Sequence, residues 1–165
     1  HLLFEHQVGF VNRFISATYR SRSVQSGAVP EIDKADVGAF LDVEARALVH
    51  YLLFADEAKF PAGGIGGDAK LKTHFLSRGP RSSSGLSLRD FDLNTRIFKH
   101  RCSYMIHSAA FKGLPKELKE RVFRRMNLAL NLENVLPEYA YLPLTEKRAI
   151  REILRHTFPD LPKGW

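Results

Sequence analysis

The sequence predicts an all-α protein, and three observations carry that prediction. Apolar residues recur every three to four positions in several long segments, which is the spacing of a helix with one buried face. No segment alternates apolar and polar residues between hairpin turns, as the strands of a half-buried sheet do. The 165 residues are 44% hydrophobic and include a single cysteine, so a packed core rather than disulfide bridges must hold the fold. We therefore expect residues 1–165 to form a single-domain bundle of about five main helices.

The first two predicted helices cover residues 2–19 and 32–58. The apolar residues of the first fall in one broad sector of a helical wheel. They are Leu3, Phe4, Val8, Phe10, Val11, Phe14 and Ile15. The second is apolar nearly all round at its centre, from Leu48 to Phe54, so we expect it to lie in the middle of the core.

Residues 60–85 are predicted to form a long Gly/Pro/Ser-rich loop between the second and third helices. Its short patterned piece at 69–76 has room for at most two helical turns. The glycine run at 63–67 is not preceded by a strand or followed by Gly-Lys-Ser/Thr, as a phosphate-binding loop would be. We interpret it as a flexible connector.

Three more main helices are predicted in the second half of the chain. The third covers residues 88–110, with Ser87 as its N-cap. The fourth covers residues 116–130, after the break at Gly113-Leu-Pro115. One apolar row along it consists of Leu118, Val122, Met126 and Leu130. The fifth covers residues 146–157 and ends before Pro159.

The formal net charge of +7 is unevenly distributed along the chain. Residues 31–57 contain seven acids and two bases, whereas residues 89–125 contain ten bases and four acids. Such a division can steer association with an acidic partner. Alternatively, the two segments face each other within the fold.

Histidines are the candidate cofactor ligands, because seven of them are present. His6 lies at the edge of the apolar sector of the first helix, and His50 interrupts the most apolar run. A buried imidazole there must be hydrogen-bonded or ligated, because an unpaired buried polar group costs about 1–3 kcal/mol. If His6 and His50 converge across packed helices, they form the best candidate site for haem or a metal. His100 and His107 share a face of the predicted third helix, but roughly 10.5 Å of helical rise keeps them from binding one ion together.

No motif indicates a metal site or catalysis. The chain has no Cys-x-x-Cys-His, no His-Glu-x-x-His and no histidine pair at i, i+4. It also lacks a Gly-x-Ser-x-Gly elbow and a recognisable carboxylate pair for acid–base chemistry. We therefore predict no catalytic residue and no metal ligand set, and the sequence requires no cofactor.

Five basic residues cover the polar face of the predicted helix at 116–130 and form a candidate partner-binding surface. They are Lys116, Lys119, Arg121, Arg124 and Arg125. Such a face can bind an acidic protein or a phosphate backbone. Glu117 and Glu120 interleave with these bases at i, i+4 spacing, which is also typical of a solvated helix face.

Several short stretches resemble the C-terminal region of an uncharacterised family of exported bacterial proteins. They are Tyr51–Ala58, Ser87–Leu93, Cys102–Ser108, Gly113–Pro115 and Arg148–Arg155. The resemblance covers most residues after about Ala47 and implies no activity. It implies a periplasmic or extracellular location and a further N-terminal part. Because the chain also starts at His1 rather than Met, we expect it to be the C-terminal part of a longer precursor.

These observations together predict a non-catalytic helical protein-interaction domain of a bacterial envelope protein. Its partner would be another protein or the N-terminal part of its own chain. The alternative is a haem- or metal-associated electron-transfer accessory of a redox protein, with His6 or His50 as ligand. Nucleic-acid binding through residues 116–130 is a third hypothesis. The longest nearly apolar run is far shorter than the roughly 20 residues of a membrane-spanning helix, so no membrane span is predicted.

Overall fold

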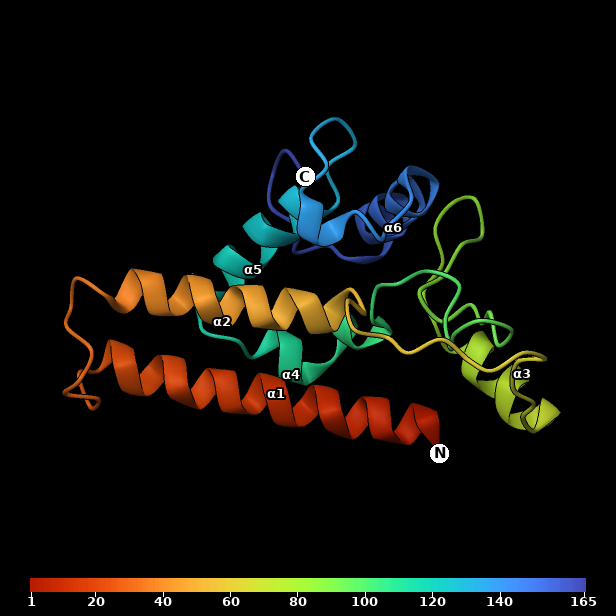
Figure 1. Cartoon of the computed structure of the whole chain (residues 1–165), viewed down its shortest axis with the longest axis horizontal. Helices are drawn as coiled ribbons and strands as arrows, with labels where there is room; N and C mark the ends of the chain where they lie inside the picture. Colours follow the sequence, from red (N-terminus) through yellow and green to blue (C-terminus); the bar gives the residue numbers. More distant parts are fainter. The chain divides into compact units, whose positions relative to one another are not determined.

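The computed structural model describes all residues from His1 to Trp165 and confirms the all-α prediction (Figure 1). It contains six α-helices, two short 3-10 helices and no β-strand. None of the helices combines the length and the apolar character that crossing a bilayer requires. The chain divides into two compact units, which we call the first unit (residues 1–51 and 105–127) and the second unit (residues 52–104 and 128–165).

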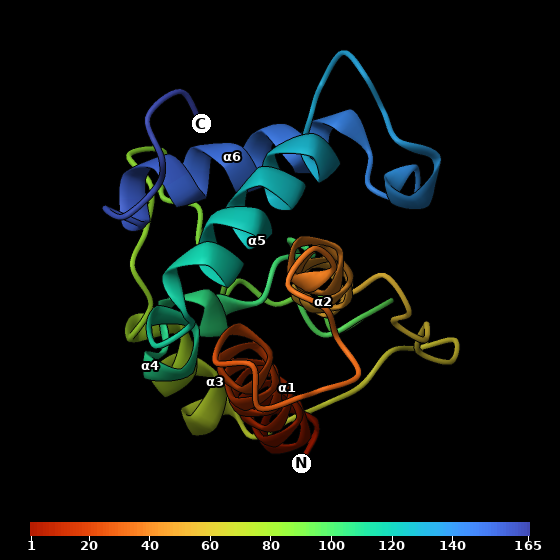
Figure 2. The same cartoon turned by 90° about the vertical axis from the view of Figure 1, so that its left-hand side faces the viewer.

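The first unit is built mainly from four helices. They are α1 (Leu2–Gln25), α2 (Val37–Leu52), α4 (Ala109–Lys112) and α5 (Lys116–Ala129). The last residue of α2 and the last two residues of α5 belong to the second unit. Figure 1 shows α1 and α2 side by side, running in opposite directions. Figure 2 shows both of them end-on and α5 from the side, so α5 crosses them at a large angle.

Aromatic rings connect the helices of the first unit. Phe10 and Phe14 of α1 stack with their ring centroids 3.9 Å apart. Phe14 then contacts Phe111 of α4 at 5.8 Å, and Phe111 contacts Phe123 of α5 at 5.6 Å. The predicted apolar row of the fourth helix is completely buried at Leu118, Val122 and Met126 of α5, and at Leu130, which follows α5 and belongs to the second unit. The core of this unit is therefore largely aromatic on α1 and aliphatic on α5.

The second unit has less helix. Its elements are α3 (Ala69–Ser77), η1 (Tyr104–His107, which starts in this unit and continues into the first), η2 (Pro137–Tyr139) and α6 (Leu144–Thr157). The predicted two-turn piece at 69–76 is α3, and Asp68 caps it by accepting the N–H of Leu71 at 2.7 Å. An aromatic cluster of Phe75, Phe91, Phe98 and Tyr104 packs beside α3, with ring centroids 5.0–6.1 Å apart.

The predicted third helix at 88–110 is wrong. Asp90 accepts the N–H of Ser87 at 3.0 Å, but no helix follows Ser87 and the chain reverses. Asp92 accepts the N–H groups of Asn94 and Thr95, and Leu93 adopts a positive φ of 62°. Side-chain hydrogen bonds of this kind compete with the helix for the backbone donors. Only η1 and the first two residues of α4 are helical within this range.

Candidate functional site

His6 lies in the core of the first unit and is 8% exposed. Its ring stacks on Tyr51 of α2 with the centroids 5.6 Å apart, and it meets Phe10 edge-on at 6.4 Å. Burial disfavours the charged imidazole and lowers the pKa of His6 to about 4. His6 is therefore neutral at pH 7. A neutral imidazole can pack among aromatic rings in a core, and it is also the form of histidine that binds a metal or haem.

The other candidate histidines lie in different surroundings. His50 is half-buried, on the margin of the apolar face of α2, whereas Leu48, Val49 and Leu52 are buried. His100 and His107 do not share a helix, because residues 100–103 are not helical. The predicted common face of these two histidines is therefore wrong.

The structure brings together no group of three or more His, Cys, Asp or Glu side chains that could hold a metal ion. Cys102 is a buried free thiol in a non-helical segment. Burial raises the pKa of its thiol. Cys102 therefore stays protonated at neutral pH.

The basic face of α5 is partly neutralised within the first unit. Nη1 of Arg121 lies 2.5 Å from Oδ1 of Asp42 on α2. The Lys116 ammonium lies 4.0 Å from Glu120, and the Lys119 ammonium donates to the Lys112 carbonyl at 2.5 Å. Arg124 is exposed and Arg125 is half-buried. The acidic and basic segments thus face each other at Asp42 and Arg121, which was the second of the two interpretations of the charge distribution.

The outer face of α1 carries an exposed apolar stripe, most of which belongs to the broad apolar sector predicted from the sequence. The broad apolar sector spans about 160° at 100° per residue, wider than the roughly 100° that a core-facing stripe needs. Phe10 and Phe14 occupy its inner half and are completely buried. The outer half remains accessible at Phe4 (64% exposed), Val8 (41%) and Ile15 (44%), with Val11 half-buried, and Tyr19 (66%) continues this surface just beyond the sector. We call these five residues the α1 stripe.

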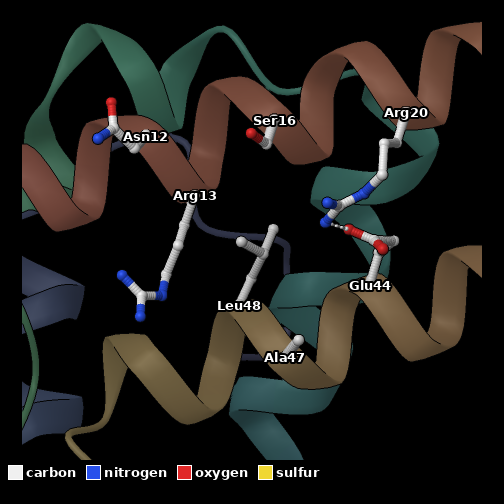
Figure 3. Close-up of a pocket in the computed structure, with 7 residues that line it drawn as sticks. All are labelled: Asn12, Arg13, Ser16, Arg20, Glu44, Ala47 and Leu48. Carbon is white, nitrogen blue, oxygen red and sulfur yellow. Dashed lines mark hydrogen bonds and ion pairs between the residues drawn. The ribbon is translucent and has the colours of Figure 1, made fainter.

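A groove of about 350 Å³ lies between α1 and α2, and Figure 3 shows the residues that line it. They are Asn12, Arg13, Ser16, Arg20, Glu44, Ala47 and Leu48. Nη2 of Arg20 lies 2.7 Å from Oε2 of Glu44, which is the ion pair drawn in Figure 3. Asn12 and Ser16 lie between the α1 stripe and the two arginines on the helical wheel. The groove therefore borders the stripe.

Tyr51 supports the arginine side of this groove. The Arg13 guanidinium lies over the Tyr51 ring, 4.2 Å from its centroid, and the Tyr51 hydroxyl donates to the His6 carbonyl at 3.2 Å. Burial raises the pKa of Tyr51, and the Arg13 charge opposes that rise. Gly9 makes room for the hydroxyl, because a Cβ there would lie 2.6 Å from it. Arg13 and Arg20 are seven residues apart and therefore share a face of α1. This spacing could have indicated from the sequence that the two arginines lie together, and the sequence analysis did not use it.

Comparisons with protein-family models, with curated proteins and with solved structures found no match to this chain.

Proposed function

We propose that this chain is a non-catalytic protein-interaction domain of a bacterial envelope protein, and that α1 is its docking helix. The observation that supports this proposal most is the α1 stripe, an apolar surface of α1 that the core leaves exposed. Contiguous exposed apolar patches on soluble domains commonly mark interaction sites. The envelope location rests on the sequence resemblance alone.

The spacing of the α1 stripe fits a partner helix. Phe4, Val8, Val11 and Ile15 are separated by four, three and four residues, which is the seam of two helices packed side by side. From residue 4 to residue 19 the stripe extends about 22 Å along α1. That length matches four turns of a partner helix.

The charge of the surface indicates an acidic partner. The adjoining groove carries the cations Arg13 and Arg20 against the single carboxylate Glu44. The whole chain has a formal net charge of +7, so a second copy would be repelled and an acidic protein attracted. We therefore assign as occupant an amphipathic helix of another protein, with acidic residues beside its apolar face.

The test uses partner capture followed by reconstitution. Proteins from a periplasmic extract are captured on the full chain and on the double variant Val8→Ser/Ile15→Ser. The matched control, Val43→Ser/Leu71→Ser, changes two exposed apolar residues outside the α1 stripe. The captured protein is then purified, and its binding is measured by calorimetry at low and high salt.

We expect the stripe variant to weaken binding at least tenfold, the control to change it less than twofold, and added salt to weaken it further. Equal affinity for the stripe variant would contradict the proposal. The proposal would also be contradicted if no captured protein bound the stripe variant and the control variant differently. It would likewise be contradicted if the chain bound only to a second copy of itself.

The haem or metal hypothesis for His6 or His50 stays a prediction. Absorbance and elemental analysis of native protein test it, and a Soret band or a stoichiometric metal would favour it. Nucleic-acid binding through Lys116, Lys119 and the arginines of α5 also stays a prediction. Filter binding to DNA that shows no steep salt dependence would dismiss it.

A further inference from the structure

A small cavity in the second unit combines an apolar lining with a concentration of positive charge. Its volume is about 210 Å³. The apolar contributors are Phe54, Ala55 and Ala58, and the cationic contributors are Lys59, Arg96 and Arg101. Among the lining side chains only Glu57 is acidic. This cavity is separate from the α1 stripe and its groove, and the proposed function does not use it.

The cavity is held by hydrogen bonds between distant parts of the chain. The N–H of Phe60 donates to the Thr95 carbonyl at 2.9 Å, which ties the segment after α2 to the turn at 92–96. The Tyr141 hydroxyl donates to the Leu53 carbonyl at 3.0 Å. The cavity walls are therefore fixed by the fold.

Glu146 of α6 orients one of the arginines. Its carboxylate accepts Nε of Arg101 at 3.2 Å, Nη2 at 2.6 Å and the backbone N–H of Arg101 at 2.7 Å. The guanidinium also lies over the Tyr141 ring, 5.3 Å from its centroid. An arginine has five N–H donors, so this fork leaves the Nη1 donors of Arg101 without a protein acceptor. Arg101 is thus both positioned and only partly satisfied.

The other two cations are also incompletely paired. Nε of Arg96 donates to the Phe98 carbonyl at 3.1 Å, but its Nη atoms make no hydrogen bond and lie no closer than 3.9 Å to Glu146. Asp92 lies 3.8 Å from Arg96 and, like Glu146, does not line the cavity. Lys59 is exposed at the cavity and makes no hydrogen bond.

Glu57 is the one acid among the lining residues, and its pKa is raised by burial, against the opposing effect of Arg96 and Arg101. Its carboxylate already accepts the N–H of Ile97 at 3.4 Å. The lining therefore offers cationic donors that no protein acceptor uses, on the Nη atoms of Arg96, on Nη1 of Arg101 and on Lys59.

We propose that this cavity binds a small organic carboxylate, with the carboxylate group on Arg96, Arg101 and Lys59 and a short apolar group against Phe54, Ala55 and Ala58. Charge-assisted hydrogen bonds from guanidinium groups to a carboxylate are roughly twice as strong as hydrogen bonds between neutral groups. The volume corresponds to about seven water molecules at roughly 30 Å³ each, which suits a molecule the size of benzoate. The apolar lining favours an organic acid over inorganic phosphate.

To test the site, the full chain is titrated with benzoate, and two-dimensional NMR of the backbone amides monitors the binding. Benzamide, which has the same shape without the charge, and inorganic phosphate are titrated in parallel. We expect saturable benzoate binding in about the millimolar range, with shifts at residues 54–59 and 95–101, and at least tenfold weaker binding of benzamide.

Three variants locate the site. Arg96→Gln should weaken benzoate binding about tenfold and Lys59→Gln a few-fold, because each removes a cation that faces the carboxylate. Glu57→Gln should tighten binding, because it removes the opposing charge and keeps an acceptor for Ile97. Lys70→Gln, at an exposed lysine of α3 outside the cavity, is the matched control and should change nothing. Lys59 makes no protein contact that folding needs, so its variant remains informative if Arg96→Gln unfolds.

Three results would overturn the site. They are equal binding of benzamide, unchanged benzoate affinity in both cation variants, and phosphate binding more tightly than benzoate. None of them bears on the α1 stripe, so failure here and failure of the proposed function can be told apart.

Discussion

His6 is the residue whose chemistry the fold changes most clearly. The sequence singled it out because an imidazole lay at the edge of an apolar helix sector. The structure shows that Tyr51 and Phe10 surround it with aromatic surface. Tyr51 is close to His6 in space but lies on α2, so the spacing of residues within α1 could not identify this contact.

The lowered pKa of His6 makes stability depend on pH. The imidazole has a pKa of about 4 in the folded chain, compared with 6.5 for an unperturbed histidine, so the unfolded chain takes up a proton first as the pH falls. The stabilisation is complete above about pH 6.5 and is lost between there and about pH 4. We expect roughly 3 kcal/mol of the free energy of unfolding to disappear across this interval.

Urea unfolding at pH 7, 5.5 and 4.5 measures this effect, with His6→Phe as the control that keeps the ring contacts and does not titrate. As the pH is lowered, the free energy of unfolding of the unmodified chain should fall relative to that of His6→Phe, by up to roughly 3 kcal/mol. Parallel pH profiles for both proteins would contradict the buried neutral histidine.

Gly64 shows why one position in the glycine-rich loop cannot carry a side chain. Its φ is +67°, and a Cβ there would press on the Leu93 carbonyl oxygen and lie 2.8 Å from the Asn94 Cα. We expect Gly64→Ala to lower the free energy of unfolding by about 2 kcal/mol or more, because backbone atoms cannot move aside as side chains can. Thermal unfolding of Gly64→Ala and Gly66→Ala measures it, since a Cβ at Gly66 meets nothing within 4 Å. Equal effects at the two positions would show that the loop is not packed as described.

At the scale of elements, α2 is the helix that was predicted to lie in the core, although it ends at Leu52 and not at residue 58. Leu52 is completely buried, and its carbonyl accepts the N–H of Ser103 at 2.8 Å. We expect Leu52→Ala to lower the free energy of unfolding by roughly 2–5 kcal/mol, through lost contacts and the cavity left behind. Val43→Ala, at an exposed position of the same helix, should cost less than about 0.5 kcal/mol. A Leu52→Ala variant as stable as Val43→Ala would refute the placement of α2.

Glu146 anchors α6 to the segment before Cys102. Its side chain is 8% exposed and forms the fork with Arg101, whose side chain is 15% exposed. Removing one partner of a buried ion pair leaves a buried charge, so Glu146→Ala should cost about 3–5 kcal/mol. The exposed pair Lys116–Glu120 is the contrast, and Glu120→Ala should cost less than about 0.5 kcal/mol. Chemical denaturation measures the free energy of unfolding of both variants. Similar decreases for Glu146→Ala and Glu120→Ala would contradict this account.

Sequence reasoning succeeded for elements whose periodicity agrees with their local hydrogen bonding. The row Leu118, Val122, Met126 was predicted and is buried in α5. It failed at 88–110, where the apolar residues also have helical spacing but Asp92 captures the backbone donors that a helix needs. The resulting reversal pairs Phe91 with Phe98 through an isolated bridge. Periodicity alone cannot distinguish these outcomes, because the competing contacts involve side chains from α3 and the turn itself.

The candidate sites were harder to predict than the helices for a related reason. A wheel for one helix shows how wide an apolar sector is, and the width of the sector on α1 was the available signal for the exposed stripe. It does not show which half of the sector faces the core. Likewise, Glu146 and Arg101 are 45 residues apart, so only the tertiary fold brings them together.

At the scale of the whole molecule, the positive charge and the α1 stripe together define the proposed interaction. The net charge of +7 raises the encounter rate with an acidic protein, whereas the apolar contact determines how long the complex lasts. Added salt should therefore slow association of the reconstituted complex, and loss of apolar residues from the α1 stripe should speed its dissociation. Stopped-flow or surface-plasmon measurements separate these two rates. A salt-independent association rate would contradict the electrostatic part of the account.

Photo-crosslinking in living cells tests the docking role of α1 most directly. A benzophenone amino acid replaces Val8 in the α1 stripe in one variant, and replaces Val43, an exposed apolar position of α2, in the other. We expect the probe at position 8 to form a crosslink to one acidic protein and the probe at position 43 to form none. A probe at position 8 that captures no protein, or one that captures the same proteins as the probe at position 43, would contradict the central claim that the outer face of α1 is a docking surface.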